Sequence, residues 1–203
     1  MIIMTRKGDK QFEVTSKEDM MEQLTLTQIW AKSNPFQSIL THSLISGTVA
    51  QVLFEQMLAP GVRRQLCKRL SCNLTQLKQW VGYLVALHDI GKVEGQFQYR
   101  WSEMREKLDI AGLRPQYFDE RPIRHEQTTG YCLSHRIWAQ VEDRRAKRFY
   151  ASILAAHHQG KDGIKGNTQE PSWSQKQEEL ECELRKKFLG TETLWMPAVD
   201  KPD

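Results

Sequence analysis

The sequence predicts an all-α protein that folds as a compact bundle of helices. Apolar residues recur at spacings of three and four along most of the chain, which is the period of a helix that buries one face. Regular alternation of apolar and polar residues, which a half-buried strand needs, is scarce. Residues that start and stop helices also bound several of the periodic segments.

The first predicted helix spans residues 39–58, after Asn34-Pro35, and Pro60-Gly61 is expected to end it. Residues 1–27 are polar and weakly patterned, which favours an N-terminal arm or an irregular cover. The helix contains apolar residues that fall on one face, and this face is expected to be buried. Its members are Leu44, Ile45, Val49, Val52, Leu53 and Met57.

The second predicted helix begins after Asn73 and continues towards His88. Asn73 has the side chain of an N-cap, and Gln76 takes the capping-box position three residues later. An apolar stripe, expected to be buried, then follows the helical period, and Gly91 marks the end of the segment. The members of the stripe are Leu74, Leu77, Val81, Leu84 and Val85.

The second half of the chain contains four further segments. Residues 96–124 are aromatic and charged with two prolines, which predicts a short helix followed by a loop. A third clear helix begins near His125, and a fourth begins at about Arg144. A loop over 160–175 is rich in Gly, Lys, Gln and Ser. It precedes one more amphipathic helix over 175–189.

Length and composition exclude several classes of protein. The 203 residues suit one domain of ordinary size, and a hydrophobic fraction of 39% supports a core and argues against wholesale disorder. No apolar run approaches the roughly 20 residues that a membrane-spanning helix needs. The N-terminus lacks the apolar region of a secretory signal. We therefore expect a cytoplasmic protein with no membrane partner.

Charge and cysteine content say little about function. A formal net charge of +4 tolerates a polyanionic partner without requiring one. Two basic runs are interpreted either as guides for a nucleic-acid strand or as solvated helix faces. These runs are Arg63, Arg64, Lys68 and Arg69, and Arg144, Arg145, Lys147 and Arg148. The four cysteines lack metal-binding or disulfide spacing, so we expect reduced thiols at Cys67, Cys72, Cys132 and Cys182.

The strongest chemical signal is the string His88-Asp89-Ile90-Gly91-Lys92, which lies where an apolar helix ends. Adjacent residues inside a helix point about 100° apart, but at a frayed last turn both side chains can converge on one point. Gly91 lets the backbone leave without obstructing that point. His157-His158, shortly before Gly160, repeats the arrangement at the end of another predicted helix.

Four separate segments thus supply histidine at or near predicted helix ends. A single histidine beside apolar residues is more often a hydrogen-bonded core residue, but the set as a whole favours a metal site. Imidazole nitrogens bind transition ions, and a carboxylate can bridge two ions about 3.5–4 Å apart, a role that suits Asp89. His135 is interpreted as an ordinary core or surface histidine. The members of the set are His42, His88, Asp89, His125, His157 and His158.

These residues resemble the HD superfamily of metal-dependent phosphohydrolases, and within it the HD nuclease domain of the CRISPR-associated helicase-nuclease of type I systems. The resemblance covers about residues 28–160. The HDIGK string is shared widely across HD proteins, whereas its FQY continuation and the paired histidines favour the nuclease. The matching strings are Trp30-Ala31-Lys32-Ser33, Ala86-Leu87-His88-Asp89-Ile90-Gly91-Lys92, Phe97-Gln98-Tyr99, His125-Glu126 leading to Gly130, and Ala155-Ala156-His157-His158.

The resemblance implies a compact HD-type helical bundle around a metal site, over residues 28–203. It implies that His42, His88 and Asp89 hold one divalent ion, and that a second is held or lined by Asp89, His125, His157 and His158. Lys92 would lie over the scissile phosphate. The residues fix neither the number of ions, one or two, nor their identity among Mn, Fe, Co, Ni, Mg and Zn.

The activity that the resemblance implies is metal-dependent cleavage of single-stranded DNA in type I CRISPR interference, with Asp89 and Lys92 as catalytic residues. The implied partners are a helicase domain and an RNA-guided surveillance complex. Phe97, Tyr99 and Trp101 are interpreted either as base-stacking or as packing residues. Two alternatives stay open: a phosphohydrolase acting on nucleotides, and a catalytically weakened HD-like binding module.

One departure from the family pattern concerns a further aspartate, which HD proteins of this kind carry on a helix well downstream of the paired histidines. Asp162 lies too close to His158, and Asp200 and Asp203 lie in a terminal tail that contains proline. We therefore expect either a domain truncated at its C-terminal end or a variant with a weakened first metal site. No GxxxxGK[ST] loop occurs, so no helicase domain is expected in this chain.

Overall fold

The computed structural model describes residues 24–110, 113–115, 124–158, 171–191 and 193–199. Helices make up most of these residues and one two-stranded sheet accompanies them, which confirms the all-α prediction. Most of the expected N-terminal arm lies outside the described residues. Among the described residues, no helix combines the length and the apolar character that crossing a bilayer requires.

A short hairpin precedes the first long helix. Strands β1 (Trp30–Ser33) and β2 (Phe36–Ser38) pair antiparallel, with Trp30 opposite Ser38 and Ser33 opposite Phe36. The hairpin was not predicted, because three or four residues are too few to display an alternating pattern. Ser38 then caps helix α2 (Ile39–Gln56), since its hydroxyl accepts a hydrogen bond from the backbone N–H of Thr41 at 3.2 Å.

The prediction of the buried face of α2 is wrong. Large apolar residues of the expected face are exposed, and the helix instead buries a face with small and polar residues that include Ser43 and Gly47. A Cβ atom at Gly47 would lie 2.6 Å from the backbone oxygen of Gly82, so the two helices approach closely there. The exposed residues are Ile45, Val49, Val52, Leu53 and Met57.

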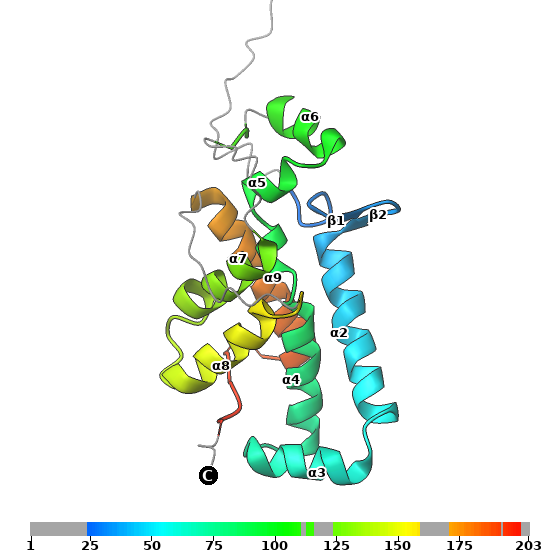
Figure 1. Ribbon diagram of the computed structural model, residues 1–203, viewed down its shortest axis with the longest axis vertical. Helices are drawn as coiled ribbons and strands as arrows, with labels where there is room; N and C mark the ends of the chain where they lie inside the picture. Colours follow the sequence, from blue (N-terminus) through cyan, green and yellow to red (C-terminus); the bar gives the residue numbers. More distant parts are fainter. Residues whose placement is uncertain (1–23, 111–112, 116–123, 159–170, 192, 200–203) are drawn as a thin grey trace, which may run out of the picture.

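Helices α2, α3 (Pro60–Arg69) and α4 (Leu74–Ala86) run down, across and back up the molecule (Figure 1). Pro60 begins α3 rather than a loop, because the first turn of a helix does not need its missing N–H. The predicted capping box of α4 is confirmed: Asn73 and Gln76 exchange two side-chain to backbone hydrogen bonds of 2.9 Å. Of the predicted apolar stripe, Leu77 is buried and Leu74 is exposed.

The remaining elements that the structure describes lie beside the upper half of α4 and above it (Figure 1). Two short helices occupy the region where one was predicted, and the helices expected to begin near His125 and Arg144 begin there. The last helix begins at Pro171, four residues before the prediction, because Trp173 is buried in the core. The elements are η1 (Ile90–Lys92), α5 (Gly95–Gln98), α6 (Ser102–Ile110), α7 (His125–Cys132), the π-helical turn η2 (Leu133–Ile137), α8 (Arg144–Ala155) and α9 (Pro171–Leu189).

Helix α9 packs against α4 and against the turn η1 that follows α4. The Gln177 side chain donates a hydrogen bond of 2.8 Å to the Val93 backbone oxygen and so ties α9 to that turn. Deeper in the core, the Tyr83 hydroxyl donates to the buried Glu181 carboxylate. Burial raises the pKa of Glu181, against the lowering effects of Tyr83 and Arg185. The four cysteines are free thiols, as expected.

Candidate metal centre

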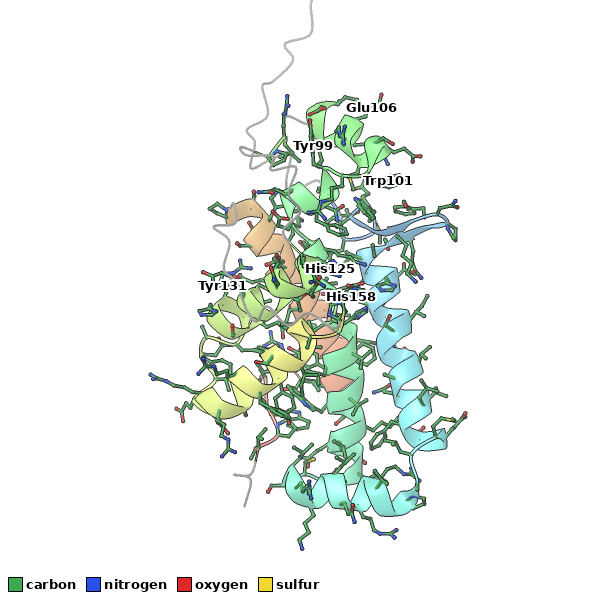
Figure 2. The ribbon with its side chains drawn as sticks, viewed as in Figure 1. Tyr99, Trp101, Glu106, His125, Tyr131 and His158 are labelled. Atoms are coloured by element: carbon green, nitrogen blue, oxygen red, sulfur yellow. The ribbon has the colours of Figure 1, made fainter. Side chains whose placement is uncertain are left out.

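All six residues of the predicted constellation meet at one place, around the buried Asp89 carboxylate. They come from four separate parts of the chain: the first turns of α2, the end of α4, the start of α7 and the end of α8. Figure 2 shows His125 and His158 close together near the upper end of α4. The basic run on α3 lies at the opposite end of α4 (Figure 1).

One oxygen of the Asp89 carboxylate, Oδ2, faces α2 and the turn η1. The Nε2 atom of His42 lies 3.0 Å from it and the Nε2 atom of His88 lies 3.2 Å from it. The Lys92 ammonium lies 2.7 Å from the same oxygen and also donates a hydrogen bond of 3.3 Å to the Ala31 backbone oxygen. This side of the carboxylate therefore holds two imidazoles and one fixed cation.

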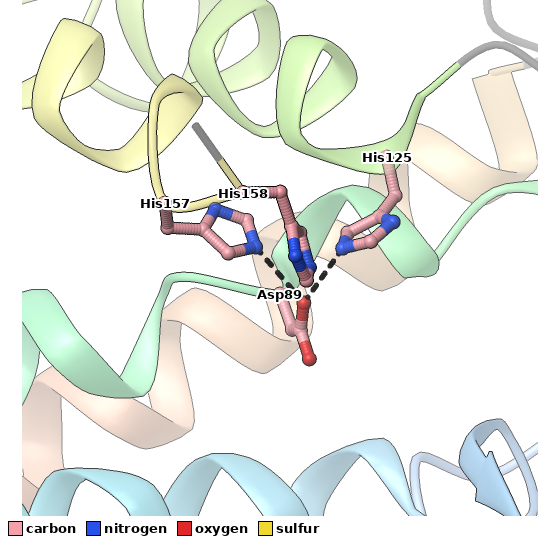
Figure 3. Close-up of side chains that lie close together, drawn as sticks. All are labelled: Asp89, His125, His157 and His158. Atoms are coloured by element: carbon pink, nitrogen blue, oxygen red, sulfur yellow. Dashed lines mark ion pairs between the residues drawn. The ribbon is translucent and has the colours of Figure 1, made fainter. Parts of the chain in front are cut away.

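The other oxygen, Asp89 Oδ1, faces helices α7 and α8. The Nε2 atoms of His125 and His157 lie 3.0 Å and 3.5 Å from it. The ring of His158 lies between the other two histidine rings (Figure 3), with centroids 4.3 Å from His157 and 5.0 Å from His125. A single carboxylate is thus placed between two groups of imidazoles.

The outer ring nitrogen of three histidines determines which tautomer faces Asp89. The Nδ1 atoms of His88 and His157 lie 2.8 Å and 2.6 Å from backbone oxygens three residues earlier, at the last turns of α4 and α8. The Nδ1 atom of His42 lies 3.0 Å from the Gln37 amide oxygen. Because these oxygens can only accept, each Nδ1 is the protonated donor. In a neutral ring, Nε2 then presents a lone pair to Asp89.

Three buried polar atoms at the centre lack hydrogen-bond partners, as expected if lone pairs of the histidines face the carboxylate. Asp89 Oδ1, His125 Nε2 and His157 Nε2 are buried and have no hydrogen-bond partner. Lone pairs that face one another without a proton between them are unfavourable, and a cation between them resolves this. The donor set of imidazole nitrogens with one carboxylate suits a divalent transition ion. Two ligand groups form: His42 with His88 and Asp89, and Asp89 with the three remaining histidines.

The protonation of these groups follows from the same contacts. Burial alone would raise the pKa of Asp89, but hydrogen bonds from the facing histidines, when their Nε2 atoms are protonated and donate, outweigh burial and hold that pKa well below its ordinary value. Burial lowers the pKa of His157, yet its contact with Asp89 and its bond to the Leu154 carbonyl raise it overall. Burial and the neighbouring His157 and His125 lower the pKa of His158. The carboxylate is therefore ionised throughout the neutral range.

Several supporting residues were not predicted from the sequence. Glu126 is buried, and its carboxylate lies 3.6 Å from His125 Nδ1 while it pairs with Arg124. Thr129 of α7 is hydrogen-bonded to the segment that joins α4 to η1. Its hydroxyl accepts from the Gly91 N–H at 3.0 Å and donates to the His88 backbone oxygen at 3.1 Å. Glu126 directly follows His125 in the sequence, and this adjacency was the one feature that could have indicated its supporting role.

Gly91 allows the turn η1 to pack directly on α7. A Cβ atom at this position would lie 2.0 Å from the His125 backbone oxygen and 2.6 Å from the Thr129 backbone nitrogen. No side chain fits there. The glycine of the HDIGK string therefore sets how closely His88 and Asp89 approach His125 at the start of α7.

The other residues singled out from the sequence, one histidine and three aromatic residues, lie outside the two ligand groups. His135 is exposed and stacks on Tyr131 with ring centroids 4.5 Å apart, away from the ligand groups. Phe97 and Tyr99 are buried, and Phe97 meets the edge of His125. Trp101 is half-buried next to the hairpin.

The expected downstream aspartate is not found among the described residues. Helix α9 follows the paired histidines but contains no aspartate, and none of its residues belongs to either ligand group. The aspartates weighed from the sequence, Asp162, Asp200 and Asp203, lie outside the described residues.

Fold and site together define an HD-type domain, a helical bundle with histidine and aspartate side chains gathered at its centre. The chain belongs to the family described as "Cas3, HD domain", which matches residues 30–202. It is 32% identical over 147 residues to the CRISPR-associated endonuclease/helicase Cas3 of Thermus thermophilus. That match covers 71% of this chain and 15% of the relative, so the chain spans only a small part of the relative's length.

Solved structures share the fold. The crystal structure of T. fusca Cas3 is similar with a TM-score of 0.68 and 19% identity, over 80% of this chain and 19% of that one. The Thermus thermophilus cas3 HD domain, solved in the presence of Ni²⁺, is similar with a TM-score of 0.58 and 22% identity. That match covers 85% of this chain and 66% of that domain.

Proposed function

We propose that this chain is a metal-dependent nuclease domain that hydrolyses phosphodiester bonds in single-stranded DNA. The observation that supports this most directly is the division of the Asp89 carboxylate between two groups of histidines, one at each oxygen. A carboxylate so placed suits a bridge between two divalent ions, the arrangement that many phosphodiester-cleaving enzymes use. Family membership supports the same chemistry.

The roles of the residues follow from their positions. His42, His88 and Asp89 would hold one ion, and Asp89, His125, His157 and His158 would hold the second. When bound, such ions supply Lewis acidity that activates water and stabilises negative charge developing at phosphorus. Lys92, fixed against Asp89 and the Ala31 carbonyl, adds a positive charge beside the substrate phosphate.

The proposed cofactors are one or two divalent ions. A site with several imidazoles and one carboxylate accepts Mn, Fe, Co, Ni or Zn according to supply, and Mg remains a candidate for the water-rich first group. The Ni²⁺ used with the related HD domain supports a transition ion. Fewer protein ligands in the first group predict weaker retention there.

The proposed partners come from the relatives. The Thermus relative is described as an endonuclease/helicase, so we propose that residues 28–203 act together with a helicase domain. We propose further that the target strand reaches this nuclease from an RNA-guided CRISPR surveillance complex. Neither partner is needed for the basal test.

Circular single-stranded DNA tests the proposal, because it detects internal cleavage without interference from strand ends. The purified chain is loaded in turn with Mn²⁺, Co²⁺, Ni²⁺, Mg²⁺ and Zn²⁺, and bound metal is measured by elemental analysis. Cleavage with at least one ion is expected, and none with EDTA. Activity on mononucleotides but not on the circle would replace the proposal with a nucleotide phosphohydrolase. Absence of metal and of both activities would favour a binding module.

A further inference from the structure

A continuous series of aromatic rings runs from the surface of the hairpin to the metal centre. Phe36 stacks on Trp101 with centroids 5.6 Å apart, and Trp101 meets the edge of Trp30 at 5.8 Å. Trp30 stacks on Phe97 at 4.7 Å, and Phe97 meets the edge of His125 at 5.5 Å. Each ring contacts the next, so a surface residue is linked to a candidate metal ligand through four contacts.

The outer end of this series is open to solvent. Phe36 is 49% exposed although large aromatic residues favour burial, and its ring lies nearly parallel to Trp101, with an interplanar angle of 21°. Figure 2 shows Trp101 beside the hairpin, above His125 and His158. An exposed ring backed by a second, parallel ring offers a flat apolar face at a fixed position.

Hydrogen bonds hold Trp30, one member of this series, against the turn η1. The Trp30 indole N–H donates to the Gln98 backbone oxygen at 3.1 Å. The Gln98 amide donates both to the Trp30 backbone oxygen at 2.9 Å and to the Lys92 backbone oxygen at 2.7 Å. The position of Trp30 relative to Lys92 is therefore set by hydrogen bonds within the protein.

Positive charge accompanies the inner rings. The Lys92 ammonium lies 5.7 Å from the Phe97 ring centroid, and the Arg100 guanidinium lies 5.5 Å from the same centroid. Lys32 is exposed on the hairpin. Aromatic faces next to basic groups are the combination that binds single-stranded nucleic acid, because bases stack while phosphates meet the cations.

We propose that Phe36 and Trp101 form a stacking platform for an unpaired base of a DNA strand whose phosphate lies at the metal centre. The proposal rests on the proposed function, since it concerns how the substrate strand is held. It also gives a reason for preference for single strands: bases paired in a duplex stack on their neighbours and expose no face to Phe36. The paired rings thus act in positioning, away from the reacting atoms.

The test measures equilibrium binding of a labelled single strand by fluorescence anisotropy, in EDTA and low salt so that no cleavage occurs. Phe36→Ala should weaken binding at least about fivefold, the lower end of what one base stack contributes. Phe36→Trp should keep the affinity of the unaltered chain within about twofold. The matched control is Phe149→Ala on α8, where an aromatic residue of similar exposure, 45%, should not affect binding.

A strand of equal length whose nucleotides lack bases separates stacking from charge. The unaltered chain and Phe36→Ala should bind this strand equally. Equal binding of the normal strand by both proteins would overturn the platform. A loss of affinity by Phe36→Ala that is as large on the strand without bases as on the normal strand would also overturn it, because such a loss would come from folding or charge.

Hydrolysis of bis(p-nitrophenyl) phosphate, a small phosphodiester without a base, tests the proposed function independently of the platform. Phe36→Ala should hydrolyse it at the rate of the unaltered chain when both are loaded with metal. Binding of single strands without cleavage of either substrate would overturn the proposed function and leave the platform standing. Absence of any binding of the normal strand by the unaltered chain would overturn the platform.

Discussion

Gln98 and Trp30 exchange three hydrogen bonds although 68 positions separate them in the sequence. The Trp30 N–H donates to the Gln98 amide oxygen at 3.0 Å, its indole N–H donates to the Gln98 backbone oxygen, and the Gln98 amide donates back to the Trp30 backbone oxygen. Two of the strings on which the family resemblance was based, WAKS and FQY, are therefore parts of one contact. Gln98 is fully buried there.

This contact predicts that Gln98→Glu is strongly destabilising. A carboxylate can still accept from Trp30 but cannot donate to the Trp30 and Lys92 backbone oxygens, which are left facing a buried negative charge. The free energy of unfolding should fall by more than about 2 kcal/mol, measured by denaturant titration. Gln140→Glu, an exposed position, is the control, and a loss as small as in that variant would contradict the assigned role.

Asp89→Ala should abolish cleavage and remove most bound metal, because its carboxylate faces both ligand groups. Elemental analysis and the circular-strand assay measure the two effects on one preparation. His135→Ala, which removes an exposed histidine outside the ligand groups, should keep activity within a few-fold. Metal-dependent cleavage by Asp89→Ala at near the original rate would disprove the bridging role.

Lys92→Ala should slow turnover but keep the metal, since an ammonium is not a ligand. Its contact with Asp89 Oδ2 at 2.7 Å means that the variant also removes a cation from a buried carboxylate. Metal per chain and the turnover number should be measured together, with Lys78→Ala as control, because Lys78 pairs with Glu55 outside the ligand groups. If Lys92→Ala lost its metal, the lysine would be a support of Asp89 and not a group that acts on substrate.

Gly91→Ala should destabilise the chain by more than about 3 kcal/mol, because a new Cβ atom would meet the backbone of α7 at 2.0 Å and this contact cannot yield. Gly61→Ala provides the opposite case. Nothing lies within 4 Å of that position, which is inside α3, so the change should be neutral or stabilising by up to about 1 kcal/mol. Thermal and denaturant unfolding of both variants checks this, and similar stabilities would refute the close packing.

Glu181→Gln should change how stability depends on pH. Burial raises the pKa of Glu181 in the folded chain, so folding favours its protonated form. As pH rises from the ordinary glutamic acid pKa through this raised value, the unaltered chain loses stability that the variant keeps. The difference in unfolding free energy, variant minus unaltered, should therefore increase over that interval and then level off. A difference that is constant with pH would show that the buried carboxylate is not penalised.

Local signals in the sequence predicted much of this structure. The capping box at Asn73 and the starts of α7 and α8 depend on residues close in sequence, and they were predicted correctly. The face that α2 buries depends instead on its partners. Gly47 allows close approach to Gly82, and the apolar residues Ile45 and Val49 remain outside, which helical periodicity alone does not reveal.

The site was predictable to the extent that it consists of ligand-type side chains. Histidine and aspartate at helix ends have a recognisable pattern, and the structure brings all six together. Gln37, Glu126 and Thr129 orient those ligands through contacts that any amide, carboxylate or hydroxyl could make. Such residues become recognisable only when the fold places them beside a histidine.

Because the proposed ligands come from four separate parts of the chain, the proposed metal binding would link metal supply to the lifetime of the protein. An unfolded chain holds His42, Asp89, His125 and His157 far apart, so it offers no comparable site. Ions that bind only the folded form withdraw it from the unfolding equilibrium, by about 2.7 kcal/mol when free metal is a hundredfold above its dissociation constant. In a cell short of metal, this domain would unfold more often and would be degraded sooner.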